Sequence, residues 1–247
     1  MAVEYHDTSY TDSAAHTLKR YHSTWRYVLR YIIQLLILNP ALHMVLRLKV
    51  TNCSLLLAGR KGQKSTISGP DEGNSKPIII MPNHQSHFDA PLIIATLPRK
   101  FGAKVAVGAA TDNFFRSWLR SKPARCLVNT YPIDRDNSHR HNGVSRRLVH
   151  EGVPILVFPE GTRTRDGKLG RFHEGLAHIA IEEGAQILPV VIQGAREAWP
   201  ADHKLWRSGR PHISVTYLPL ITPKPNETAA ILTKRVKAAI SKQLMLK

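Results

Sequence analysis

From residue 77 onward, short apolar runs alternate with longer segments whose apolar residues recur at helical spacing. The apolar runs predict strands at 77–81, 103–108, 126–133, 154–158, 187–192 and 212–218. The helical spacing predicts helices at 88–97, 113–121, 138–151, 172–183 and 227–245. Strands that alternate with helices are typical of an α/β fold, so we expect a mixed, largely parallel sheet flanked by helices.

The N-terminal segment has a different pattern. Residues 1–16 are polar, and Arg26, Arg30 and Gln34 then recur every four positions, which puts them on one stripe of a helix surrounded by large apolar residues. A wide apolar face with basic flanks is typical of a helix in the membrane interface, where Arg20, Arg26 and Arg30 could meet anionic headgroups. An ordinary helix that packs on the domain has the same pattern.

A transmembrane span is not expected in this segment. Only 16 residues without Lys, Arg, Asp or Glu separate Arg30 from Arg47, whereas a spanning helix needs about 20 apolar residues. Asn39-Pro40 is also expected to break the helix and to separate it from a second apolar stretch, 41–48. We therefore expect residues 1–50 to form a tail and amphipathic membrane-associating helices, and residues 51–247 to form the α/β domain.

The charge of the chain points to an anionic partner. The 247 residues include 35 Lys and Arg against 18 Asp and Glu, a formal net charge of +17. Nucleic acid, an anionic membrane surface and a phosphorylated substrate all fit this excess. Cys53 and Cys126 stand far apart in apolar stretches, so neither a disulfide framework nor a zinc pattern is present in the sequence.

Polar clusters follow three of the predicted strands. NHQSHFD (83–89) follows the first, DRDN (134–137) the third and PEGTRTRDGK (159–168) the fourth. Ligands of open α/β sheets bind beyond the carboxyl ends of the strands. If these strands are parallel neighbours, the three clusters meet at one edge of the sheet.

The first cluster contains a candidate catalytic pair. His84 and Asp89 are five residues apart, about 140° around a regular helix, so they can meet only if His84 lies in a loop and Asp89 in the first helical turn. Ser86 and Asp89 have the spacing of a capping box, which places a helix start near residue 86. His84, His87 and Asp89 could instead hold a metal, but the Arg and Lys of the other clusters favour an anionic ligand over a cation, and no metal is expected.

The third cluster combines glycine with guanidinium and hydroxyl groups, which suits a phosphate site, although a basic surface turn has the same composition. The spacing does not match a P-loop, and neither a Gly-x-Ser-x-Gly elbow nor a cysteine occurs in the three clusters. A His–Asp pair without a protein nucleophile indicates that a substrate hydroxyl attacks, with His84 as general base and Asp89 orienting the imidazole.

These clusters resemble the motifs of the glycerolipid acyltransferases, in particular the 1-acyl-glycerol-3-phosphate (lysophosphatidate) acyltransferase branch. Order and spacing agree across about residues 77–195. The matching segments are NHQSHFD with His84 and Asp89 for the catalytic motif, YPIDR with Arg135 for the second, FPEGTRTRDGKLGRF with Glu160, Gly161, Thr162 and Arg163 for the third, and ILPVVIQG with Pro189 for the fourth.

The resemblance implies acyl transfer from acyl-CoA or acyl-carrier protein to the hydroxyl of lysophosphatidate, giving phosphatidate in phospholipid biosynthesis. It implies no cofactor and no covalent acyl-enzyme. The glycerophosphate site would comprise Arg135 and the segment Glu160–Arg163. The resemblance also implies a monotopic protein at the cytoplasmic face, with an anionic membrane surface and not nucleic acid as its partner.

Two other functions fit part of the pattern. A member of the same family could acylate another lysolipid or a small polar acceptor, and the sequence does not separate these substrates. A non-catalytic basic protein that binds membrane or nucleic acid would explain the charge, but not the acids placed among the cations of the three clusters.

Overall fold

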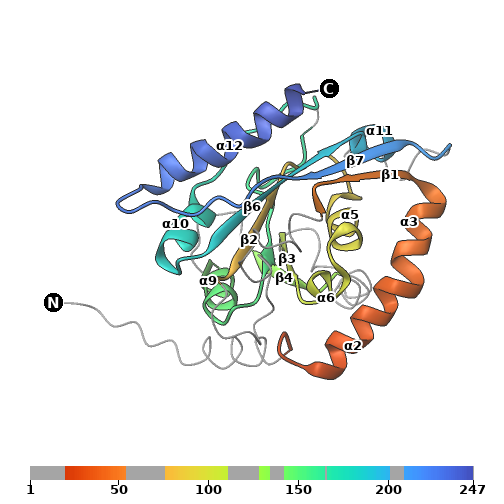
Figure 1. Ribbon diagram of the computed structural model, residues 1–247, viewed down its shortest axis with the longest axis horizontal. Helices are drawn as coiled ribbons and strands as arrows, with labels where there is room; N and C mark the ends of the chain where they lie inside the picture. Colours follow the sequence, from red (N-terminus) through yellow and green to blue (C-terminus); the bar gives the residue numbers. More distant parts are fainter. Residues whose placement is uncertain are drawn as a thin grey trace, which may run out of the picture.

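The computed structural model describes residues 20–53, 76–110, 128–133, 142–164, 166–200 and 209–246. Within them, seven strands form one sheet in the order β1-β7-β6-β2-β5-β3-β4 (Figure 1). All neighbouring strands are parallel except β6 and β7, which are antiparallel. The strands are β1 (Arg47–Thr51), β2 (Ile78–Pro82), β3 (Ala106–Ala110), β4 (Thr130–Ile133), β5 (Ile155–Leu156), β6 (Gln186–Gln193) and β7 (His212–Tyr217). The mixed, largely parallel sheet predicted from the sequence is confirmed.

Helices cover both faces of this sheet (Figure 1). One face carries α5 (Asp89–Thr96), α6 (Arg99–Gly102), α11 (Ala195–Ala198) and the N-terminal helix, and the other carries α9 (Asn142–His150), α10 (Gly175–Glu182) and α12 (Ala229–Met245). The predicted helix at 113–121 lies outside the described residues. The short helices α6 and α11 were not predicted, because four residues are too few to show a helical period.

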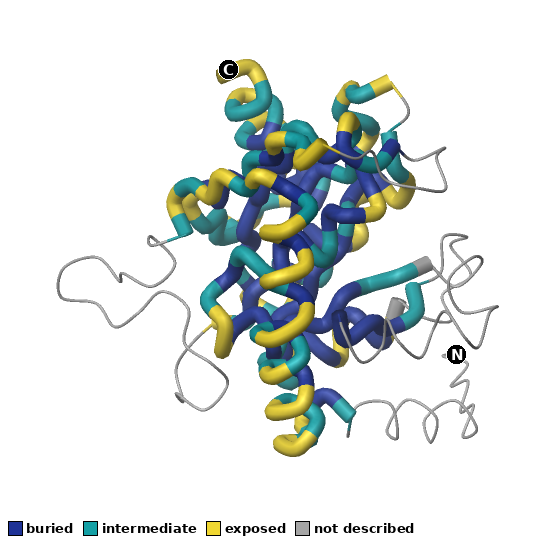
Figure 2. Tube along the Cα trace, turned by 90° about the vertical axis from the view of Figure 1, so that its right-hand side faces the viewer, coloured by how far each residue is buried: buried dark blue, intermediate teal, exposed yellow. Residues whose placement is uncertain are grey.

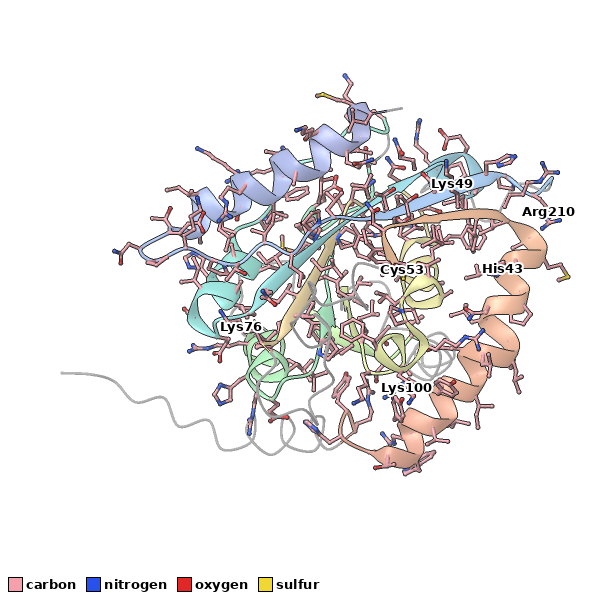
Figure 3. The ribbon with its side chains drawn as sticks, in the orientation of Figure 1. His43, Lys49, Cys53, Lys76, Lys100 and Arg210 are labelled. Atoms are coloured by element: carbon pink, nitrogen blue, oxygen red, sulfur yellow. The ribbon has the colours of Figure 1, made fainter. Side chains whose placement is uncertain are left out.

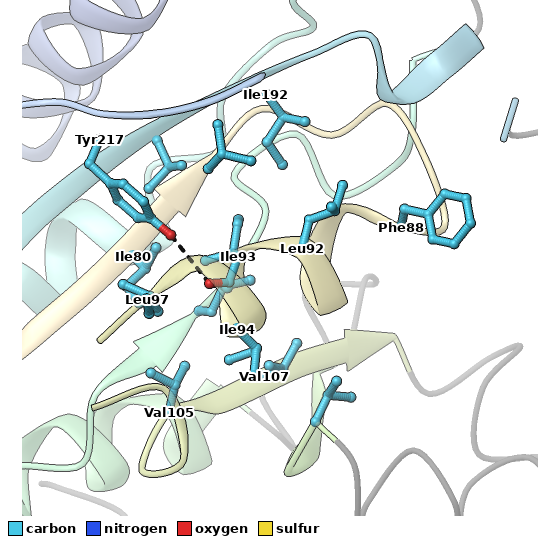
Figure 4. Close-up of a cluster of buried hydrophobic side chains, with 14 of the residues drawn as sticks. Ile80, Phe88, Leu92, Ile93, Ile94, Leu97, Val105, Val107, Ile192 and Tyr217 are labelled. Atoms are coloured by element: carbon cyan, nitrogen blue, oxygen red, sulfur yellow. Dashed lines mark hydrogen bonds between the residues drawn. The ribbon is translucent and has the colours of Figure 1, made fainter. Parts of the chain in front are cut away.

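Two apolar cores fill the space between the sheet and its helices. Residues of β2 alternate between them: Ile78 and Ile80 belong to the first core, and Ile79 and Met81 to the second. This explains the continuous apolar run of β2, since a strand buried on both faces needs apolar side chains at every position. Figure 4 shows part of the first core, where the hydroxyl of Tyr217 donates to the carbonyl oxygen of Ile93 at 3.2 Å.

Strand β1 was not predicted. It lies at the edge of the sheet and pairs in parallel with β7, and most of its residues are exposed. The boundary expected between residues 50 and 51 falls inside this strand, and the expected second apolar stretch, 41–48, is divided between a helix and β1. Arg210, which precedes β7, also donates to the carbonyl oxygen of His43 at 2.7 Å and ties the end of the N-terminal helix to the sheet (Figure 3).

The expected helix break at Asn39-Pro40 is wrong. The chain runs as α2 (Thr24–Ile33), a π-helical turn η1 (Gln34–Leu38) and α3 (Asn39–Val45) in one continuous rod (Figure 1). Pro40 lies in the first turn of α3, directly after η1, whose wider turn lets the amide of Asn39 donate to Gln34 five residues back. A π turn relieves the clash that a proline ring makes in a regular helix. The resulting helix, Thr24–Val45, is by length and composition long and apolar enough to cross a membrane.

This helix turns its polar stripe inward and its apolar face outward. Arg30 and Gln34 are buried together with Leu38 and Leu42, and Nε of Arg30 donates to the carbonyl oxygen of Ala103 at 3.0 Å. Figure 2 shows the outward turns of this helix as exposed. The exposed large apolar side chains are Trp25, Val28, Leu29, Ile32, Leu36, Ile37 and Met44. Arg30 therefore supports the fold, and the expectation from the sequence that it could meet anionic headgroups is wrong.

Candidate functional site

The site begins where β2 ends at Pro82. The chain forms a loop over residues 83–88 and enters α5 at Asp89. His84 lies in the loop and Asp89 in the first helical turn, and Nδ1 of His84 is 2.8 Å from Oδ2 of Asp89. The sequence spacing required this arrangement for the two side chains to meet. The His84 side chain keeps 19% of its surface exposed, whereas the Asp89 side chain is fully buried.

The surroundings of Asp89 define the tautomer of His84. Oδ2 of Asp89 also accepts hydrogen bonds from the backbone amides of Gln85 at 2.6 Å and Ser86 at 2.8 Å. An oxygen that receives two N–H donors acts as an acceptor toward the imidazole as well, so Nδ1 carries the hydrogen of the neutral ring. Nε2 is then the basic nitrogen, and it belongs to the partly exposed ring.

The predicted capping box is half formed. The Asp89 carboxylate reaches back to the Ser86 amide, as the motif requires. The Ser86 hydroxyl, however, accepts from the amide of Phe88 at 3.2 Å and donates to the carbonyl oxygen of Trp199 at 2.8 Å. The helix consequently starts at Asp89 and not near residue 86, and Ser86 ties the loop to the segment after α11.

Two residues that sequence reasoning missed hold the His84 loop. The buried Asn83 side chain pairs with the backbone of Ile192 in β6, accepting from its amide at 2.8 Å and donating to its carbonyl oxygen at 3.0 Å. The ring of Phe158 stacks on the imidazole of His84, with centroids 3.7 Å apart and planes 17° apart. Asn83 was visible next to the motif, and Phe158 ended a predicted strand, but neither pattern named its partner.

The segment after β5 meets the His84 loop, because β5 and β2 are parallel neighbours. The first and third polar clusters therefore converge as predicted. Oε1 of Glu160 accepts from the amide of His84 at 2.8 Å, and the amide of Thr164 donates to the carbonyl oxygen of His84 at 2.9 Å. Glu160 is buried, and its burial raises the pKa of the carboxyl above the ordinary value, while hydrogen bonds from Gly170 and His84 act in the opposite direction.

Arg163 lies beside the loop of the first cluster. Its Nη1 is 2.8 Å from Nδ1 of His87 and also contacts Nε2 of the same ring. His87 packs in addition against the ring of Trp199 at 4.8 Å. Gly161 adopts a positive φ of 68° in the turn before Arg163, and Thr162 is exposed next to it. This part of the third cluster therefore presents a cation and exposed polar groups close to His84.

Two further points of the sequence analysis concern Arg135 and the alternative of a metal site. Arg135 and the rest of the second cluster lie outside the described residues. Within the part of the chain that the structure describes, no group of three His, Cys, Asp or Glu side chains could hold a metal. His87 is turned toward Arg163 and Trp199, so the set His84, His87 and Asp89 does not form such a group.

Comparisons with known proteins find acyltransferases among the relatives of this chain. A 1-acyl-sn-glycerol-3-phosphate acyltransferase from Chlamydomonas reinhardtii is 30% identical over 174 residues, which cover 68% of this chain and 49% of that protein. A lyso-ornithine lipid O-acyltransferase from Pseudomonas aeruginosa is 32% identical over 132 residues, covering 52% of this chain and 48% of that protein. The chain spans about half the length of these relatives.

The crystal structure of the 1-acyl-sn-glycerophosphate (LPA) acyltransferase PlsC from Thermotoga maritima has the same fold. It superposes with a TM-score of 0.67 at 21% sequence identity, over 93% of this chain and 86% of that one. The family model described as Acyltransferase matches residues 64–193, which include the His84 loop and the whole third cluster. Because this match spans more than half of the 247 residues, the chain belongs to the acyltransferase family.

Proposed function

We propose that this protein transfers a fatty acyl group from acyl-CoA or acyl-carrier protein to the free hydroxyl of 1-acyl-glycerol-3-phosphate, producing phosphatidate. The observation that carries the proposal is the 2.8 Å contact between His84 and a fully buried Asp89, with the imidazole partly exposed. Arg163 lies next to His87 of the loop that contains His84, where its guanidinium can bind an anionic acceptor. Membership of the acyltransferase family supports the reaction class.

In this reaction the acceptor hydroxyl gives its proton to Nε2 of His84 while its oxygen attacks the thioester carbonyl. The ester C–O bond forms, the C–S bond breaks, and the proton passes from the imidazolium to the leaving thiolate. Asp89 accepts the Nδ1 hydrogen bond throughout and stabilises the imidazolium. No covalent acyl-enzyme is required, because the acceptor hydroxyl is itself the nucleophile.

The acceptor phosphate is expected to bind the guanidinium of Arg163, which can form two parallel hydrogen bonds to phosphate oxygens. The backbone of Gly161 and the hydroxyl of Thr162 lie in the same turn, and we expect Arg135 to contribute from the second cluster. Holding the phosphate at a fixed distance from His84 would bring the hydroxyl within reach of Nε2.

We propose that the protein is monotopic, at the cytoplasmic face of an anionic membrane. The N-terminal helix exposes an apolar face that water solvates poorly, while Arg30, Gln34, Leu38 and Leu42 pack on the domain. A helix fixed along its length to the domain can sink its outer face into one leaflet, but it cannot cross the bilayer without leaving those contacts. Protease treatment of sealed vesicles that digests the α/β domain outside but leaves the residues before Thr24 protected inside would indicate a spanning helix instead.

The relative that acylates a lyso-ornithine lipid supports a second candidate acceptor of the same reaction class. The test is a thiol-release assay of the full chain with acyl-CoA and acyl-carrier protein as donors. The acceptors are lysophosphatidate, lyso-ornithine lipid and lysophosphatidylcholine. The proposal expects the highest kcat/KM with lysophosphatidate, together with loss of nearly all turnover in a folded His84→Ala variant. A higher kcat/KM with lyso-ornithine lipid would assign the second function, and an active His84→Ala variant would contradict the mechanism.

A further inference from the structure

Glu160 uses both of its carboxylate oxygens within the protein. Oε1 accepts from the backbone amide of His84 and Oε2 from the backbone amide of Gly170, each at 2.8 Å. The residue is buried, with 7% of its surface exposed. A carboxylate enclosed in this way cannot turn toward an acceptor without leaving two amides unsatisfied. It would also repel a phosphate, since both groups are anionic.

Gly170 gives independent evidence that the Glu160 carboxylate is held in a fixed position. A Cβ atom at position 170 would lie 2.8 Å from Oε2 of Glu160, closer than side chains pack. The backbone of Gly170 does not have a positive φ, so its conformation does not require glycine. The lack of a side chain at this position is therefore explained by the close approach of the Glu160 carboxylate.

The segment that follows Glu160 also binds the backbone of His84, at its carbonyl oxygen. The amide of Thr164 donates to the carbonyl oxygen of His84 at 2.9 Å. His84 is thus held at its N–H by Glu160, at its C=O by Thr164 and at its ring by Asp89. Arg163 lies in sequence between the two residues that hold the His84 backbone, which links the expected phosphate ligand to the position of the base.

We infer that Glu160 is a positioning residue, which holds the backbone of His84 so that the imidazole meets Asp89 and the acceptor hydroxyl, and that it is not a ligand of the acceptor. This inference rests on the proposed function for the identity of the reaction. It replaces the substrate-binding role that the sequence resemblance implied for Glu160.

The experiment measures kcat and the KM values of both substrates for Glu160→Gln, Glu160→Asp and Gly170→Ala in the full chain. Glutamine offers one acceptor oxygen and an NH₂ group, so it can satisfy only one of the two amides. Aspartate keeps the charge but is one methylene shorter and cannot reach both. Alanine at position 170 keeps Glu160 and displaces its carboxylate. The matched controls are Glu174→Gln and Gly175→Ala. Glu174 is exposed, and its side chain makes no capping hydrogen bond to the helix that follows it. A Cβ atom at position 175 would meet nothing within 4 Å.

We expect all three variants to lower kcat by roughly ten- to a hundredfold, because a small displacement of the base has an effect of that size. The KM for the acceptor should stay within about twofold of wild type, and both controls should match wild type. A Glu160→Gln variant with raised acceptor KM and unchanged kcat would overturn the inference in favour of acceptor binding. Full activity in Gly170→Ala or Glu160→Asp would also overturn it.

Thermal melting of each variant separates positioning from loss of structure. If Glu160→Gln does not fold, Glu160→Asp and Gly170→Ala decide the outcome. Failure of all three to fold would assign Glu160 a purely structural role. The kinetics are measured with whichever acceptor and donor the wild-type protein uses, so inactivity toward lysophosphatidate would refute the proposed substrate without touching the role of Glu160.

Discussion

Replacing Leu36 and Ile37 by glutamine should greatly weaken binding to membranes. Both side chains lie on the outward face of the N-terminal helix, with 66% and 61% of their surface exposed. Complete burial of such a side chain is worth about 1.5–3 kcal/mol, so the part that a leaflet can still bury contributes roughly 1–2 kcal/mol for each. The double variant should therefore lose roughly 2–4 kcal/mol of binding, which is about thirtyfold to nearly a thousandfold in the partition coefficient.

The assay is co-sedimentation with vesicles that contain anionic phospholipid, together with turnover of a long-chain and a soluble short-chain acceptor. Glutamine forms helices well, and the side chains of Leu36 and Ile37 are mostly exposed, so the melting temperature without vesicles should be close to that of wild type. Ile231→Gln is the matched control, because Ile231 is 52% exposed on α12, across the sheet from the N-terminal helix (Figure 1).

The double variant should lose turnover of the long-chain acceptor and retain that of the short-chain one, while Ile231→Gln should behave as wild type in every measurement. Moderate salt should weaken the binding of wild type without abolishing it, since apolar burial does not depend on ionic strength. A folded double variant that sediments as tightly as wild type would refute the assignment of this face to the membrane.

Three further outcomes test the site. Asp89→Asn should reduce kcat by about three to four orders of magnitude, because an amide can donate to Nδ1 of His84 and favour the wrong tautomer; a loss below tenfold in a stopped thiol-release assay would contradict the dyad. Arg163→Ala should reduce kcat/KM about ten- to a hundredfold, mainly through the KM for lysophosphatidate, since one charge-assisted contact is worth about 1.5–3 kcal/mol. Arg163→Lys should recover part of that loss, and unchanged acceptor kinetics would exclude Arg163 from the site. Burial raises the pKa of Glu160, so between the ordinary value of the unfolded chain and the raised folded value the folded state binds the extra proton, and the contribution of Glu160 to stability falls as pH rises. The melting temperature of wild type minus that of Glu160→Gln should therefore decrease as the pH rises above the ordinary titration range of a glutamate, and a constant difference would contradict the raised pKa.

Local patterns in the sequence were enough to predict six of the seven strands that the structure describes in the sheet and the central pair of the site. A strand buried on both faces, such as β2, needs an uninterrupted apolar run, and this run is readable without knowledge of its neighbours. His84 and Asp89 are separated by five residues, so their contact depends on one loop and one helical turn. The same short-range reasoning did not find β1, whose pairing with β7 joins residues about 165 positions apart.

Contacts between distant residues decided the rest. The amide of His84 meets Glu160 across 76 positions, and Asn83 meets Ile192 across 109. No local period records such partners, so the sequence indicated that Glu160 belonged to the site but not that it faces the backbone of the base. The amphipathic pattern of the N-terminal helix was equally readable, yet only packing against Ala103 showed that its polar stripe is the buried one. A period defines two faces of a helix, and the surface against which the helix packs determines which of them meets water or lipid.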